Sequence, residues 1–258
     1  MTDDQNNLAP FPDWPAVVQR VRARTPARLL EGRSGAAYRT GTQMELREAH
    51  AAARDAVRTE LDLQRDFGQA VVDQWKLFEV STRARNKDEY LLRPDLGRCL
   101  NEESKAQVSA LCPRERDLQI LIGDGLSVTA VVKQVPSLLP LLHEEAQSRQ
   151  WNVGRCFCVR YCRVGLLNEV GELLSPRVAI LLIGERPGLA TDESLSAYLA
   201  YQPRKTHTDA QRNLMSNIHD RGTRPRQAAT RIINLAEQMM KAQASGFSLR
   251  EQSPALER

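Results

Sequence analysis

Three short, almost uniformly apolar runs set the strongest limit on how this chain can fold. They are LQILIG (118–123), FCVRY (157–161) and VAILLIG (178–184). Each run is too short and too evenly apolar for an amphipathic helix, and each has the composition of a strand that is buried on both faces. Longer helical stretches separate the runs. This strand–helix–strand alternation predicts an α/β domain with a doubly wound, mostly parallel sheet of the Rossmann-like type.

The segments between and after these runs have the patterns of helices. VTAVVKQVPSLLPLLHEEAQ (128–147) and VGLLNEVGELL (164–174) are predicted crossover helices. We expect Pro136 and Pro140 to bend or break the first of them, because proline lacks the amide that a helix interior requires. A last helix is predicted over 225–246, where the final glycine is expected to act as a left-handed cap.

The N-terminal part of the chain has a helical pattern. Thr42 and Glu45 have the spacing of a capping box, which predicts a helix start. An apolar stripe follows on one helical face, formed by Leu46, Ala49, Ala53, Ala56, Val57 and Leu61. FGQAVVDQW (67–75) is a second helical stretch. We therefore predict a loosely ordered extension over 1–31, a helical subdomain over 32–105, an α/β domain over 106–247 and a flexible tail over 248–258.

Two of the predicted strands end in glycine-bearing turns, GDGLS (123–127) and GERPGL (184–189). Ligands of an open parallel sheet lie beyond the carboxyl ends of its strands, so these turns are candidate ligand contacts. Neither turn is a GxGxxG or a GxxxxGK[ST] motif, and the known phosphate-binding loops therefore give no support to nucleotide binding.

Four side chains of these turns are candidate site residues. Asp124 and Ser127 follow the first strand, and Glu185 and Arg186 follow the last one. In the ligand-binding interpretation, Ser127 caps a helix whose amides face the ligand, while Glu185 and Arg186 offer an acceptor and a donor fork. In the alternative interpretation these are ordinary turns, where Asp124 and Ser127 only cap the next helix and Glu185 pairs with an arginine.

The cysteines and histidines form no recognisable metal or nucleophile motif. Cys156 and Cys158 are predicted to share one strand face, but the paired CxxC spacing of a zinc site is absent, so we expect buried core cysteines and no metal. His50 lies on an apolar helical stripe and is expected to be a hydrogen-bonded core residue. No acid, base and nucleophile form a compact set. We therefore expect no catalytic residues in this chain, and a cofactor-binding subunit whose chemistry a partner completes.

Composition and charge exclude several classes of protein. The 258 residues include 36 Lys and Arg against 32 Asp and Glu, a net charge of +4 that is spread along the chain. Because no basic run or basic face is evident, nucleic acid is not an expected partner. No apolar run approaches the ~18 residues of a membrane helix, and the first residues lack the pattern of a signal peptide. We expect an intracellular protein with reduced cysteines.

Several long motifs resemble the small (light) subunit of ethanolamine ammonia-lyase, an adenosylcobalamin-dependent bacterial enzyme. The similarity covers most of residues 31–247, in order. The motifs that carry it are YLLRPDLGR (90–98), ILIGDGLSVTAV (120–131), FCVRYCRV (157–164), VAILLIGERPGLATDESLSAYLAY (178–201), SNIHDRGTRP (216–225) and KAQASG (241–246).

The resemblance implies a function that the spacing of residues alone does not predict. It implies a radical conversion of ethanolamine to acetaldehyde and ammonia, in which a TIM-barrel large subunit holds the substrate and adenosylcobalamin lies between the two subunits. The implied cobalamin contacts are Val164, Glu185 and Leu214, the last at a position where the family has cysteine. The implied location is the cytoplasm or a bacterial microcompartment, without membrane attachment. Two other classes stay open: a nucleotide-binding α/β protein that acts alone, and a scaffold that docks a partner without touching a cofactor.

Overall fold

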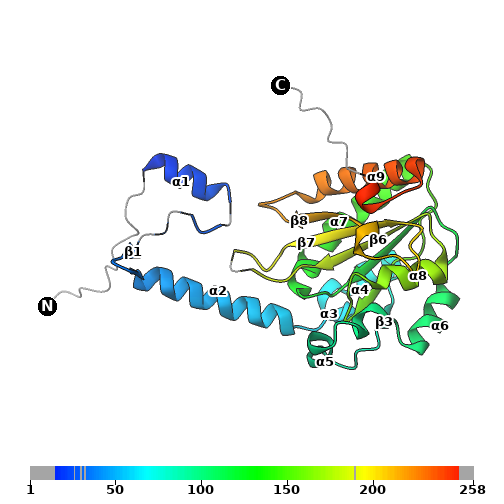
Figure 1. Ribbon diagram of the computed structural model, residues 1–258, viewed down its shortest axis with the longest axis horizontal. Helices are drawn as coiled ribbons and strands as arrows, with labels where there is room; N and C mark the ends of the chain where they lie inside the picture. Colours follow the sequence, from blue (N-terminus) through cyan, green and yellow to red (C-terminus); the bar gives the residue numbers. More distant parts are fainter. Residues whose placement is uncertain (1–14, 26, 30, 32, 189, 250–258) are drawn as a thin grey trace, which may run out of the picture.

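A computed structural model describes residues 15–25, 27–29, 31, 33–188 and 190–249. At its centre lies a six-stranded sheet in which the first four strands in space are parallel to one another and the last two pairings are antiparallel (Figure 1). In spatial order the strands are β3 (Glu79–Ser81), β5 (Phe157–Arg160), β4 (Leu118–Gly123), β6 (Val178–Gly184), β7 (Leu195–Tyr201) and β8 (Asn213–Ile218). The predicted doubly wound, mostly parallel sheet is confirmed.

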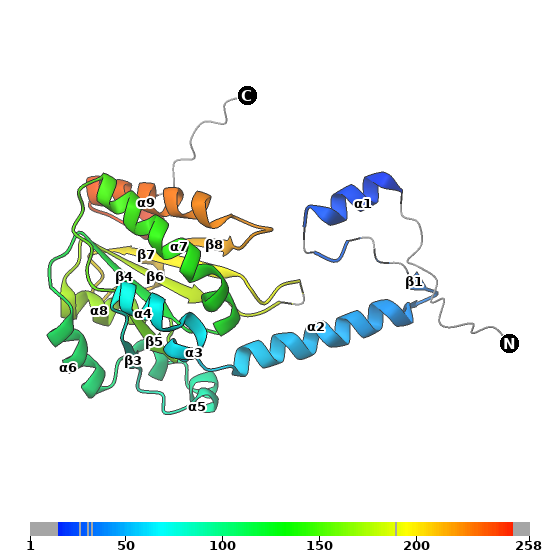
Figure 2. The same cartoon turned by 180° about the vertical axis from the view of Figure 1, so that it is seen from behind.

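The two faces of the sheet are covered by different helices. α7 (Val128–Ser148) and α9 (Pro225–Ala242) cover one face, and α6 (Glu102–Leu111) and α8 (Leu166–Leu174) cover the other (Figure 1). α3 (Leu63–Phe67) and α4 (Gln69–Trp75) lie on the same side as α7 (Figure 2). Alternate residues of each central strand enter the two cores, which is why the three apolar runs contain no regular polar positions.

Helix α7 is continuous from Val128 to Ser148, so its two prolines do not break it, and the alternative that they bend it stays a prediction. Pro136 is exposed and Pro140 is half-buried, whereas Val135, Leu138 and Leu139 on the opposite side are buried against the sheet and α9. The carbonyls that lose their helical partners therefore lie toward water, and burial of the apolar side offsets the lost hydrogen bonds.

The helix ends differ from the predictions in two places. Helix α2 runs from Thr40 to Arg58 without a side-chain cap, and Thr42 is buried inside its first turn, where its hydroxyl lies 3.4 Å from a carboxylate oxygen of Glu31. The predicted capping box at Thr42 is therefore wrong. Helix α9 ends at Ala242 with Gln243 in the left-handed conformation, so the predicted cap at Gly246 is also wrong.

The segments before the sheet extend away from it. α1 (Ala16–Ala23), the short hairpin of β1 (Arg33–Ser34) and β2 (Ala37–Tyr38), and α2 lie to one side of the sheet (Figure 1). His50 on α2 is exposed, so its predicted place in the core is wrong. Residues 1–14 of the predicted loose extension and 250–258 of the predicted tail lie outside the described residues.

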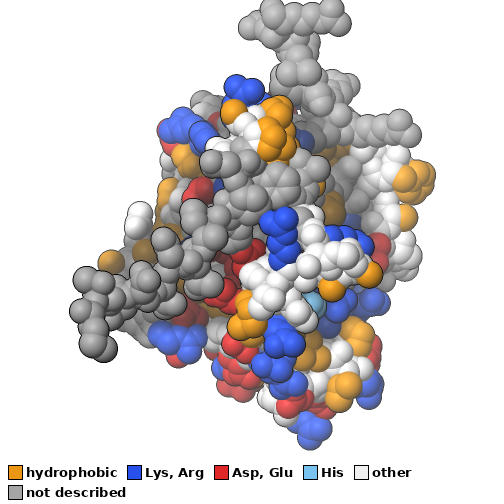
Figure 3. Space-filling view, turned by 90° about the vertical axis from the view of Figure 1, so that its left-hand side faces the viewer, with side chains coloured by type: hydrophobic (Ala, Val, Ile, Leu, Met, Phe, Trp, Pro, Cys, Tyr) orange, Lys and Arg blue, Asp and Glu red, His pale blue; other side chains and the backbone are white. Residues whose placement is uncertain are grey.

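Neither the described surface at the α1 and α2 end nor the described helices carry a feature typical of a nucleic-acid face or a membrane span. Figure 3 shows the end of the molecule that carries α1 and α2, where basic, acidic and hydrophobic side chains are interspersed. Among the described residues, no helix has the length and apolar content needed to cross a membrane.

Candidate functional site

The order of the strands brings three strand ends together. β4 leads through α7 to β5 on one side, and β5 leads through α8 back past β4 to β6 on the other. Because parallel crossovers are right-handed, this reversal of direction places α7 and α8 on opposite faces. The turns that follow β4, β5 and β6 therefore meet at one edge of the sheet, at the point where an open α/β sheet binds its ligands.

The two glycine turns fit directly against each other. A Cβ at Gly184 would lie 1.9 Å from the carbonyl oxygen of Ser127, and a Cβ at Gly125 would lie 2.4 Å from the carbonyl oxygen of Gly184. Gly125 also has a φ of +58°, a conformation that glycine adopts without steric cost. Leu126 donates its amide to the Gly184 carbonyl at 3.1 Å. The glycines that the sequence places at both strand ends are therefore required for contact between the two turns.

Asp124 is an internal anchor for the turn after β5. Its side chain is fully buried, and its two carboxylate oxygens accept the amide hydrogens of Tyr161 and Cys162 at 2.9 and 2.8 Å. These bonds fix the chain just before Arg163 and Val164. Asp124 is thus placed to shape the site, while its carboxylate is fully buried and bonded within the chain.

Lys87 is a site residue that sequence reasoning missed. It lies on α5 (Lys87–Leu92) and is buried, with its Nζ 3.4 Å from Asp124 and 3.0 Å from the Gly125 carbonyl, to which it donates. Asn86 caps this short helix by accepting the amide of Glu89. No sequence pattern marks a buried lysine, so its role is visible only from its contact with Asp124, 37 positions later in the chain.

A cavity of about 400 Å³ opens at these strand ends. Tyr90, Arg163, Val164, Glu185 and Tyr198 are among the residues that line it. Burial raises the pKa of the Tyr90 phenol, whose hydroxyl donates to the Cys162 carbonyl at 3.0 Å. The Arg163 guanidinium lies 4.2 Å from the centre of the Tyr90 ring, and its buried Nε makes no hydrogen bond to any described residue. The Tyr90 ring is fully buried, whereas Tyr198 is half-buried, so Tyr198 with the polar groups of Glu185 and Arg163 beside it can receive an amphipathic ligand.

Glu185 is held by hydroxyl groups. Its Oε2 accepts the Ser194 hydroxyl at 2.8 Å, and its Oε1 accepts the hydroxyl of Ser196 on β7. Among the described residues it has no arginine partner, so the ion pair considered from the sequence is not found. Each carboxylate oxygen retains acceptor capacity, because an ionised carboxylate has about four lone-pair sites. Glu185 is half-buried, and Arg186 beside it is exposed; both line the cavity.

The other two predicted contacts lie next to this cavity or behind it. Leu214 lies on β8 directly opposite Tyr198 of β7, and half of its surface is exposed. Val164, Glu185 and Leu214 thus come from separate chain segments to one surface. Ser127 is buried, accepts the Ala130 amide as the N-cap of α7, and donates to the Asp192 carbonyl. The capping interpretation of Ser127 is confirmed, and its hydroxyl is not free for a ligand.

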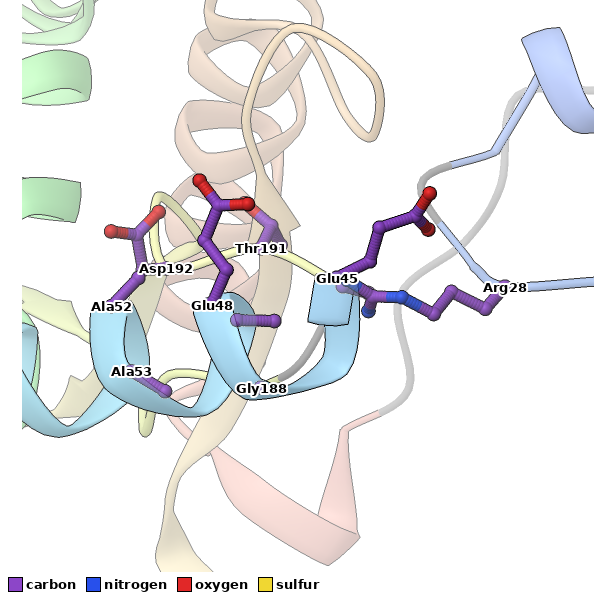
Figure 4. A pocket seen from close by; sticks show the side chains of 10 residues that line it. Arg28, Glu45, Glu48, Ala52, Ala53, Gly188, Thr191 and Asp192 are labelled. Atoms are coloured by element: carbon purple, nitrogen blue, oxygen red, sulfur yellow. The ribbon is translucent and has the colours of Figure 1, made fainter. Parts of the chain in front are cut away.

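A second cavity lies elsewhere and has a different lining. It is an open cavity of about 300 Å³ between α2 and the loop around Gly188. Figure 4 shows the side chains of Glu45, Glu48 and Asp192 at this cavity, with alanines of α2 between them. None of the predicted site residues lines it.

One cysteine–histidine contact was not expected from the sequence. Nε2 of His143 lies 3.5 Å from Sγ of Cys156, and the His143 ring packs against Trp75. Burial raises the pKa of the Cys156 thiol to about 12 and lowers the pKa of His143. Thiol and imidazole are therefore both neutral near pH 7, and this pair lacks the thiolate that a nucleophile needs. Cys156 and Cys158 are buried, as predicted.

Comparison with known proteins identifies the family of this chain. Residues 15–250 match the family described as the ethanolamine ammonia-lyase light chain (EutC). The chain is 39% identical over 233 residues to the ethanolamine ammonia-lyase small subunit of Clostridium acetobutylicum, an overlap of 90% of this chain and 94% of that one. It is 40% identical to that of Clostridium perfringens, over 89% of this chain and 76% of the relative. It is 36% identical to that of Pseudomonas syringae pv. tomato, over 98% and 88% respectively. A match over this length, at this identity, shows that the chain belongs to the ethanolamine ammonia-lyase light chain family.

Proposed function

We propose that this chain is the small subunit of an ethanolamine ammonia-lyase and that the cavity beyond β4, β5 and β6 receives one side of adenosylcobalamin. The main support is the position of Val164, Glu185 and Leu214. The family resemblance names these three residues from distant segments, and in the structure they lie around one cavity and on the strand beside it.

The residues around the cavity fit the periphery of a corrin ring. Corrin side chains end in amides, which both donate and accept hydrogen bonds. Glu185 offers acceptor oxygens, Arg163 an uncommitted Nε, and Arg186 an exposed guanidinium, while the half-buried Tyr198 offers apolar surface. Asp124 and Ser127 would contribute by fixing the turns rather than by touching the cofactor.

The size of the cavity supports a shared site. Pockets of roughly 300–1,000 Å³ hold drug-sized ligands, and a cobalamin is several times larger than such a ligand. A cavity of about 400 Å³ therefore accommodates one edge of the cofactor. The remaining surface would be covered by the large subunit, which would also hold the ethanolamine.

The protein and the cofactor would have separate tasks. When bound, adenosylcobalamin would supply the radical chemistry of the reaction. This chain would orient the corrin through Glu185 and the main chain near Val164, and it would keep water away from one side of the ring. The described residues around the cavity include no acid–base–nucleophile set that would act on the substrate.

The test uses the complex co-expressed with the large subunit. Glu185→Ala is expected to weaken adenosylcobalamin binding about tenfold, the typical loss of a hydrogen bond to a charged group, and to leave the apparent KM for ethanolamine unchanged. Glu103→Ala, an exposed carboxylate on α6, is the matched control. Adenosylcobalamin-dependent release of acetaldehyde is measured in parallel. Unchanged cofactor affinity in the Glu185 variant would contradict the assigned contact, and absence of cobalamin binding by the complex would contradict the proposed function.

A further inference from the structure

A third cavity, of about 390 Å³, lies at the start of α8. Gly165 and Asn168 line one side of it, and several residues of the segment 205–212, which precedes β8, line the other. Arg98 closes it from the short turn Leu96–Arg98. It is separate from the cofactor cavity but close to it, because Gly165 directly follows Val164 in the chain.

Arg212 is the buried cation of this cavity. Only 5% of its side chain is exposed. One Nη pairs with the Asp209 carboxylate, the other donates to Oδ1 of Asn168 at 2.9 Å, and the buried Nε makes no hydrogen bond to any described residue. Burial lowers the pKa of Arg212, Asp209 opposes this effect, and the positive charge of Arg98 adds to it. The site thus holds a desolvated guanidinium with a second guanidinium nearby and one donor uncommitted.

His207 provides a second uncommitted atom. Its Nδ1 is buried and, within the described chain, has no hydrogen-bond partner. Its carbonyl accepts Nδ2 of Asn168 at 2.6 Å, so the same asparagine fixes the backbone of His207 and the guanidinium of Arg212. Asn168 therefore holds two potential donors, from segments more than 30 residues away in sequence, at one cavity.

The charges around the cavity do not balance within the chain. Glu169 accepts the Leu100 amide and pairs with Lys105 at 3.2 Å, and Asp209 pairs with Arg212. Both carboxylates that line the cavity are therefore matched by a cation. Arg98 and Lys205 also line it and are exposed, and neither has an ion-pair partner among the described residues.

We propose that this cavity binds a phosphate-type oxyanion. Guanidinium groups and an imidazole N–H match the geometry and charge of a tetrahedral oxyanion, and Arg binds such groups through paired N–H donors. Two sources have this chemistry: free phosphate, and the phosphodiester in the nucleotide arm of a cobalamin. The second source rests on the proposed function. It is consistent with the position of Arg212, two residues before Leu214 on the strand beside the cofactor cavity.

The first arm of the test measures inorganic phosphate alone. Binding of phosphate to the full chain is followed by ³¹P NMR titration at low ionic strength. Arg98→Ala is expected to weaken it about tenfold, as loss of one charge-assisted hydrogen-bonding group does. Arg54→Ala removes an exposed arginine of α2 and is the control for net charge. Arg212→Lys keeps the charge but removes the fork, and it is expected to weaken binding similarly; its thermal unfolding is checked because the side chain is buried.

The second arm identifies the source. The complex with the large subunit is titrated with cobalamin and with cobinamide, a corrinoid that lacks the nucleotide arm and its phosphodiester. If the cobalamin phosphodiester occupies the cavity, Arg98→Ala weakens cobalamin binding about tenfold and leaves cobinamide binding unchanged. If free phosphate occupies it, the variant loses phosphate binding while both corrinoids bind as before.

The outcomes separate this inference from the proposed function. If the chain binds phosphate in a way that depends on Arg98 but the complex binds neither corrinoid, the oxyanion site is supported and the proposed function is contradicted. The oxyanion site would be overturned by two results together: phosphate binding that is absent, or equal in wild type and variant, and cobalamin binding that Arg98→Ala does not change. Because the complex still binds corrinoids in that case, the proposed function would stand.

Discussion

The buried pair of Lys87 and Asp124 gives the sharpest prediction about stability. At a separation of 3.4 Å and an effective dielectric constant of about 20, two unit charges attract each other by about 5 kcal/mol. Asp124→Asn removes this attraction and leaves the buried Lys87 with the Gly125 carbonyl and the Tyr90 ring as partners, neither of which carries a charge. The amide side chain also has a single oxygen for the two backbone amides that the carboxylate accepts now. We expect a loss of about 3–5 kcal/mol in the free energy of unfolding.

The partner substitution and the double variant make the reasoning testable. Lys87→Met is expected to cost less than Asp124→Asn, because the carboxylate keeps its two backbone donors. The double variant should cost about 1–3 kcal/mol less than the sum of the single changes, because neither buried group then lacks its partner. Lys133→Met breaks the more exposed Lys133–Glu193 pair and should cost below about 1 kcal/mol. Urea unfolding of the full chain followed by circular dichroism measures all four. Additivity within about 0.5 kcal/mol would show that the two buried charges do not depend on each other.

Two further predictions follow from other contacts. Gly184→Ala places a Cβ against the Ser127 carbonyl and should lower the free energy of unfolding by about 1–3 kcal/mol or more. Gly188→Ala is the control: its added Cβ would have no atom closer than 3.9 Å and should change the free energy of unfolding by less than about 0.5 kcal/mol. Equal melting temperatures of the two variants would contradict the contact between the turns. Burial lowers the pKa of His143 in the folded chain below its ordinary 6.5, so the unfolded chain takes up a proton first as the pH falls. The stability that the neutral His143 contributes is therefore complete above about pH 7 and is lost as the pH falls from 6.5 toward the lower pKa of the folded chain. Urea midpoints measured between pH 5 and pH 8 should therefore fall less steeply on acidification in His143→Gln, and an unchanged slope would refute this assignment.

Only part of the sheet could be predicted from the sequence. β4 and β6 coincide with their apolar runs because a central parallel strand is buried on both faces and tolerates few polar residues. β3 has only three residues, and the edge strand β8 has only two buried positions, Met215 and Ile218, so neither forms an apolar run. β3 lies within 32–105, the range predicted as a helical subdomain, yet it pairs with β5 and is part of the sheet.

The candidate site shows the same division between local and distant information. The glycine turns at 123–127 and 184–189 are local patterns, and both lie at the sheet edge where parallel topology places strand ends. Lys87 and Asn168 act through partners far away in sequence, so no local pattern identifies them. The capping predictions at Thr42 and Gly246 are wrong because residue type and spacing alone do not fix a helix end: α2 begins at Thr40, and α9 ends at Ala242 with Gln243 as its left-handed cap.

The absence of side chains where Gly125 and Gly184 meet has a mechanical consequence. The Gly125 and Gly184 backbones touch directly, and only the Ile183 side chain lies beside them, so a displacement of one turn acts on the backbone of the other. A push on Glu185 would be transmitted through the Ser127 carbonyl to the first turn of α7, and through Asp124 to the segment that carries Val164. The turns at 123–127 and 184–189 are therefore expected to move together, so that a ligand bound against one of them also acts on the other.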